Sequence, residues 1–143
     1  MLSFSKHCQS IGFPLKNIRW SWAAASLNGS CILFTVWHDE IRQGGYIIYP
    51  VTARRPGQIP DKANEQLGAR EARRLAEIAA TDSEIHTYGI ECFANKIDSP
   101  TRTRKSFDRR NLLRLCIGRD NRGFLVATIL GSETVSAKAQ LEH

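Results

Sequence analysis

Residues 18–37 have the sequence IRWSWAAASLNGSCILFTVW, and this stretch decides the fold. Large apolar side chains alternate with smaller or polar ones over residues 18–24, which is typical of a β-strand. Residues 31–37 are apolar on both faces, as in a strand at the centre of a sheet. Asn28-Gly29 lies between them and favours a type I′ turn, which needs positive φ at both central residues. We therefore predict a β-hairpin.

Two helices and four further strands are predicted around this hairpin. A short helix over residues 3–11 begins after Ser3, whose hydroxyl can cap it. Apolar residues at helical spacing predict a longer helix over residues 68–80. The other strands are predicted over residues 46–51, 85–94, 112–117 and 124–129, the last two joined as a second hairpin. Pro50 should lie at a strand end or on an edge strand, because it cannot donate a hydrogen bond to a ladder.

This order of elements predicts the α+β class. We expect a strongly bent, mostly antiparallel sheet or small open barrel of about six strands, closed on one side by the main helix. Residues 1–140 are predicted to form a single α+β domain, and residues 141–143 resemble the remnant of an expression tag. Residues 52–66 contain prolines and a glycine and predict a long surface loop, a kind of segment that is often functional.

Composition indicates a globular protein in a reducing compartment. The chain has 143 residues, of which 42% are hydrophobic and 24% are charged. No apolar run approaches the roughly 20 residues that cross a membrane, and the N-terminal residues do not resemble a secretory signal. We expect a cytoplasmic protein that binds no membrane. The four cysteines are widely separated, so we interpret them as buried, reduced residues and expect no metal.

Motifs of the common enzyme classes are missing from the sequence. It contains no phosphate-binding glycine loop, no dinucleotide fingerprint, no Gly-x-Ser-x-Gly elbow and no His-Glu-x-x-His. His38, Asp39 and Glu40 are the nearest approach to a catalytic cluster. In a strand, however, Asp39 would face away from the other two. Whether these three have a catalytic role stays open; we expect no cofactor and favour a protein that is not an enzyme.

The basic excess is more informative about function. The formal net charge is +6, and fourteen of the twenty basic residues are arginine, whose planar guanidinium suits phosphate. A run of charge is most often a solvated surface. If the clusters converge in space, however, they form a phosphate-binding face. The candidate nucleic-acid-binding residues are Arg54, Arg55, Arg70, Arg73, Arg74, Arg102, Arg104, Lys105, Arg109 and Arg110.

Three tryptophans are the candidates for stacking on a base or ligand. Trp20 and Trp22 share one face of the first predicted strand, and Trp37 lies on its partner. Tryptophans on a sheet more often belong to the core, but at an open edge they can stack on an exposed base or line a pocket for a flipped one.

The segments around these tryptophans also resemble a known group of modules. Residues 16–22, 36–40 and 68–73 are similar to a group of small bacterial domains akin to PUA-like modules, which read modified bases beside restriction nucleases. The resemblance covers about half of the chain. It implies a reader of nucleic acid rather than a nuclease and assigns no catalytic residue.

We therefore expect a non-enzymatic domain that binds DNA or RNA and reads a modified or exposed base. One alternative is a small-molecule or nucleotide pocket protein with hydrolytic activity through His38, Asp39 or Glu40. Another is a protein-interaction module in which residues 46–51 form an exposed edge strand that pairs with another chain, a second copy in a homodimer included.

Overall fold

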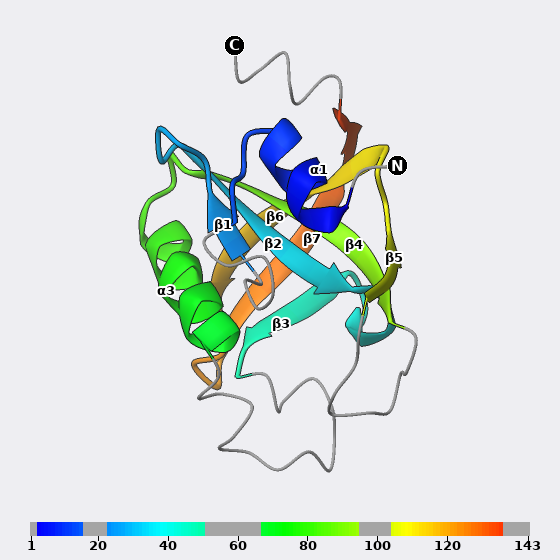
Figure 1. Ribbon diagram of the computed structural model, residues 1–143. Helices are drawn as coiled ribbons and strands as arrows, with labels where there is room; N and C mark the ends of the chain where they lie inside the picture. The colour runs from blue at the N-terminus through cyan, green and yellow to red at the C-terminus, as the bar shows by residue number, and fades with distance from the viewer. Residues whose placement is uncertain (1–2, 16–22, 51–66, 95–103, 136–143) are drawn as a thin grey trace.

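Seven strands form one strongly curled sheet, and two helices pack against it (Figure 1). The computed structural model describes residues 3–15, 23–50, 67–94 and 104–135. The strands are β1 (Ala23–Ala25), β2 (Cys31–Trp37), β3 (Gly45–Tyr49), β4 (His86–Ala94), β5 (Arg104–Phe107), β6 (Asn111–Arg119) and β7 (Leu125–Thr134). The helices are α1 (Phe4–Ser10), the short 3₁₀ helix η1 (His38–Glu40) and α3 (Leu67–Thr81). Six strands follow the order β1-β2-β4-β6-β7-β3, and β5 pairs with β4 beside this path.

Helix α3 lies between the two ends of the curled sheet. It contacts both β1 and β3, the first and last strands of the order. Its buried face consists of Gly68, Ala69, Ala72, Leu75 and Ala76. Four of these residues are glycine or alanine, so the helix axis can approach the strands closely. The predicted α+β fold, a half-barrel closed by one main helix, is confirmed.

The strand predicted to be central is central. All seven residues of β2 are buried, with β1 antiparallel on one side and β4 parallel on the other. Gly89 of β4 allows this close packing: a Cβ atom there would lie 2.7 Å from Cγ2 of Val36 and 3.3 Å from Cδ1 of Leu115. Such distances are too short for a side chain larger than hydrogen.

Strand β4 divides its pairing between two neighbours. Its first half pairs with β6 through Thr87–Gly89, and its second half pairs with β5 through Cys92–Ala94. Strand β5 was not among the predicted strands, because residues 104–107 are mostly polar and show no alternation.

The predicted short N-terminal helix is present as α1, and it covers one face of the region where β4 pairs with both β5 and β6. The hydroxyl of Ser3 accepts a hydrogen bond from the Lys6 amide and caps the helix. Trp37, Cys92 and Phe107 lie side by side on three neighbouring strands. The helix packs there through Phe4, whose ring is 5.1 Å from that of Phe107 in an edge-to-face arrangement.

Both predicted hairpins are present where the structure describes them, but the first turn is not type I′. Residues 27–30 form a four-residue loop, in which Gly29 has a φ of 75° and Asn28 does not have positive φ. The Asn28 carboxamide oxygen instead accepts hydrogen bonds from Ser26 and Ser30. Trp20, Trp22, the predicted loop of residues 52–66 and residues 141–143 lie outside the described residues.

Candidate nucleic-acid interface

The predicted basic residues that the structure describes fall into two separate groups. We call Arg104, Lys105, Arg109 and Arg110 the β5–β6 basic group, and Arg70, Arg73 and Arg74 the α3 basic group. Figure 1 shows that α3 and β5, which carry residues of the two groups, lie on opposite sides of the molecule. Arg54, Arg55 and Arg102 lie outside the described residues.

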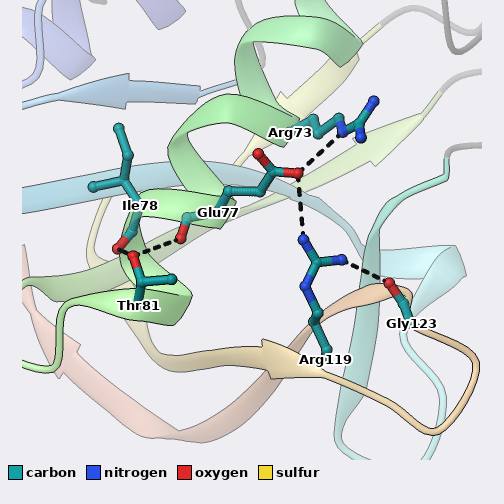
Figure 2. A network of polar contacts seen from close by, with 6 residues as sticks. All are labelled: Arg73, Glu77, Ile78, Thr81, Arg119 and Gly123. Atoms are coloured by element: carbon teal, nitrogen blue, oxygen red, sulfur yellow. Dashed lines mark hydrogen bonds and ion pairs between the residues drawn. The ribbon is translucent and has the colours of Figure 1, made fainter.

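The α3 basic group is partly neutralised by a carboxylate. Arg73 contacts Glu77 at 3.2 Å, and the same carboxylate oxygen contacts Arg119 of β6 at 3.3 Å (Figure 2). Arg119 also donates to the carbonyl oxygen of Gly123, at 2.8 Å. These contacts fasten the helix to the β6–β7 hairpin, so Arg73 has a structural partner that competes with any phosphate.

The β5–β6 basic group is different, because none of its four cations forms a salt bridge within the described residues. The carboxylate of Asp108 lies in the same turn, where it accepts hydrogen bonds from the backbone amides of Arg110 (2.9 Å) and Asn111 (3.0 Å). This carboxylate fixes the turn, a common role for aspartate. Lys105, Arg109 and Arg110 are exposed.

Arg104, the fourth member, is held against aromatic rings. Its guanidinium carbon lies 3.5 Å from the ring centroid of Phe4 and 5.9 Å from that of Trp37. Its Nε atom is buried. Cations over aromatic faces are attracted by the ring quadrupole. Arg104 therefore joins α1 to the sheet, and the exposed part of the group is Lys105, Arg109 and Arg110.

Two thiols and one histidine are buried beside this group. Burial raises the pKa of Cys8 to about 12 and that of Cys92 to about 11, against the opposite effect of Arg104. Burial also lowers the pKa of His7, and the nearby Arg109 lowers it further, while Asp108 acts in the opposite direction. At neutral pH the three side chains are therefore uncharged and suited to a core.

Trp37 is the described member of the three candidate stacking residues. It is 7% exposed and lies under α1. On the other face of the same strands, Phe93 is 36% exposed. Phe93 was not among the predicted site residues, because its sequence context predicts only a strand over residues 85–94.

The His38-Asp39-Glu40 cluster forms η1, a turn of 3₁₀ helix, rather than the end of a strand. Glu40 is buried and His38 is exposed. His38 Nδ1 contacts Oε2 of Glu91, a residue 53 positions away in the sequence. Its ring lies 5.0 Å from the Phe93 ring at an interplanar angle of 34°. No local sequence pattern indicates the contact between His38 and Glu91, because it depends on the parallel pairing of β2 with β4.

An open groove of about 410 Å³ lies between the end of α3 and the β4–β6 pair. His86, Tyr88, Arg114 and Leu130 are among its lining residues. Within the described residues, Arg114 forms no ion pair, and a Cβ atom on Gly131 would lie 2.8 Å from its Nη2 atom. The register shift between β6 and β7 leaves Leu130 unpaired and 57% exposed.

The described residues include no group of three or more His, Cys, Asp or Glu side chains able to hold a metal ion. In the same part of the chain, no helix has the length and apolar character needed to cross a membrane. No family model, no curated protein and no solved structure matches the chain. The resemblance to PUA-like modules therefore stays a prediction.

Proposed function

We propose that this protein is a non-enzymatic nucleic-acid-binding domain whose β5–β6 basic group contacts the phosphate backbone. The observation that carries the proposal is that three exposed cations lie within one short segment, residues 105–110, and none of them forms a salt bridge within the described residues. Lys105, Arg109 and Arg110 have no carboxylate partner within the described residues, whereas Arg73, Arg119 and Arg122 each have one. Unpaired guanidinium groups are free to form charge-assisted bonds to phosphate oxygens.

The expected binding is electrostatic and independent of base sequence at this contact. Each phosphate that a cation neutralises releases condensed counterions. A plot of the logarithm of the association constant against the logarithm of salt concentration therefore has a negative slope. The magnitude of this slope is about 0.9 for each phosphate contact on duplex DNA and about 0.7 for each contact on a single strand. Three exposed cations predict that this group contributes roughly two to three units of slope.

The test is a salt titration of binding by fluorescence anisotropy, with labelled DNA and RNA as separate probes. Arg110→Ala should weaken binding to every sequence and reduce the slope by about one. Arg122→Ala is the matched control, because it removes the same charge from an exposed arginine that is paired with Asp120 at 2.8 Å.

The control also lies far from the proposed interface. Arg122 is in the turn after β6, and Arg110 is in the turn before it. Nine strand residues at about 3.3 Å each separate the two turns by roughly 25–30 Å. Binding that responds equally to both substitutions would show that only net charge matters, and no binding to DNA or RNA at low salt would disprove the proposal.

A second candidate function is the binding of a small organic anion in the groove at Arg114. The groove is within the range of ligand sites, about 300–1,000 Å³, and combines one guanidinium with the apolar side chains of Leu115, Ile117 and Leu130. That lining fits a compact anionic group with an apolar or aromatic body. The groove does not include the His38-Asp39-Glu40 cluster, so this candidate is a binding function.

Thermal shift assays with AMP, and with inorganic phosphate alone, test this candidate. AMP should raise the melting temperature of the wild type and leave Arg114→Ala unchanged. Gly131→Ala should also reduce the shift, since its Cβ atom would displace the guanidinium. An AMP effect that survives both substitutions would contradict the candidate.

A further inference from the structure

The second half of strand β7 has an open edge. Strand β7 pairs with β6 over Leu125–Thr134, apart from the bulged Leu130, but β3 pairs with β7 only at residues 125–128. Beyond that point, no described strand lies on the outer side of residues 130–133. An open strand edge presents backbone N–H and C=O groups that can pair with another chain.

The backbone groups of Ser132 point toward this open edge. The amide of Val135 donates a hydrogen bond to the carbonyl oxygen of Arg110, at the end of the β6–β7 pair. The direction of the backbone groups alternates along an antiparallel strand. The amides of Gly131 and Glu133 therefore also point to β6, and that of Ser132 points away from it. Ser132 can thus donate and accept hydrogen bonds with a strand added at this edge.

An arginine of β6 extends over β7 beside this edge. Arg114 pairs with Gly131 in the register of β6 and β7, and a Cβ atom on that glycine would lie 2.8 Å from Nη2 of Arg114. The guanidinium therefore occupies the space above β7 that a side chain at position 131 would take. Arg114 is exposed and forms no ion pair within the described residues.

Glu133 carries the opposite charge on the same face of the sheet. It pairs with Leu112, two residues before Arg114 on β6, and residues two apart on a strand share a face. In the described part of the chain, its carboxylate forms no ion pair, and its Oε1 atom is buried without a hydrogen-bond partner. A buried acceptor without a partner is destabilising, so a cation brought to this carboxylate would be stabilising.

We propose that two copies of this chain associate through the open edge of β7, with the two strands antiparallel about a two-fold axis at Ser132. In this register, the Ser132 residues of the two copies exchange reciprocal backbone hydrogen bonds. Gly131 of each copy then lies opposite Glu133 of the other. Neighbouring strands are about 4.8 Å apart, so the guanidinium above Gly131 lies beside that carboxylate.

The charges of the edge identify the occupant as a second copy. Arg114 and Glu133 provide both members of an ion pair, in an order that is self-complementary when the strand is rotated about Ser132, so the contact forms twice. The result is a continuous sheet that runs through both copies. This inference goes beyond the proposed function and does not depend on nucleic-acid binding.

Sedimentation velocity over a wide range of protein concentrations tests the inference. The wild type should change from monomer to dimer as the concentration rises. Ser132→Pro should remain monomeric, because it removes the amide that points to the second copy. Proline is tolerated at an edge position whose amide faces solvent, and thermal unfolding of the variant at low concentration checks that its fold is retained.

Charge reversal tests the register of the two strands. Arg114→Glu and Glu133→Arg should each weaken dimerisation by about tenfold or more, since both symmetric contacts become repulsive. The double variant should restore the dimer, because the two charges are exchanged. Arg70→Glu is the matched control: it changes the net charge by the same amount at an exposed arginine of α3 and should leave dimerisation unchanged.

Three results would overturn the inference: a wild type that is monomeric at every concentration, a dimer that persists in Ser132→Pro, or a dimer that neither charge reversal weakens. The double variant also separates the dimer from the binding of a small anion at Arg114. Exchanging the charges should restore dimerisation, but it should not restore a thermal shift with AMP.

Discussion

The replacement Arg104→Met separates a structural arginine from its phosphate-binding neighbours. Methionine retains most of the apolar stem of Arg104 but removes the charge that lies 3.5 Å from the Phe4 ring centroid. A partly desolvated cation–π contact contributes up to about 2 kcal/mol, and the more distant contact with Trp37 at 5.9 Å adds about 0.5 kcal/mol. Methionine still packs between the rings, so the expected net loss is about 1–2 kcal/mol.

This loss is measurable by thermal and denaturant unfolding. For a chain of this size, about 1–2 kcal/mol corresponds to a fall in Tm of roughly 3–7 °C. The salt slope of nucleic-acid binding should not change, because Arg104 contacts two rings and its Nε atom is buried, whereas Arg109 contacts one ring, that of Phe107 at 4.2 Å, and is exposed. Unchanged stability together with a slope reduced by about one would show that Arg104 contacts phosphate and does not join α1 to the sheet.

Three further predictions concern the core and the cysteines. Because the pKa of His7 is lowered from 6.5 in the folded state, the unfolded chain binds its proton more readily, and stability should decrease as the pH falls below about 6.5. Unfolding by urea should show this pH dependence in the wild type but less of it in His7→Leu; equal slopes would contradict the burial of a neutral imidazole. Gly89→Ala should lower the free energy of unfolding by about 1–3 kcal/mol, because the added methyl group overpacks the sheet. Adding Val36→Ala in a double variant should restore part of that free energy. Strictly additive effects of the two substitutions would show that the two residues do not compete for space. The prediction that all four cysteines are buried is wrong for Cys116, which is exposed. A thiol reagent should therefore label one cysteine quickly in native protein and none quickly in Cys116→Ser; rapid labelling of that variant would contradict the burial of the other three.

Much of the fold follows from local patterns. Helix α3 and the hairpins were predictable because each has a periodicity and a boundary signal within one short window. The β1–β2 turn differed in type, since the side chain of Asn28 bonds to neighbouring serines instead of leaving the backbone to form a two-residue turn. Strand β5 was missed because Arg104–Phe107 has little strand character of its own and is extended by pairing with β4.

The candidate site was less predictable, since its organisation depends on residues distant in sequence. The run of cations over residues 104–110 is visible in the sequence, but the contacts of Arg104 with the rings of Phe4 and Trp37 require α1 to be placed on the sheet. The contact of His38 with Glu91 likewise needs the register of β2 and β4. Trp37 is buried, as is usual for a tryptophan on a sheet, whereas the exposed aromatic side chain is Phe93, which was not among the predicted site residues.

The salt dependence of nucleic-acid binding by an Arg109→Ala/Arg110→Ala double variant is the most direct measurement of the phosphate interface. Removing two unpaired cations should reduce the slope by roughly two on duplex DNA, while Arg122→Ala leaves it nearly unchanged. A double variant whose slope equals that of the wild type would show that these arginines do not contact phosphate and that the β5–β6 basic group is only a solvated surface.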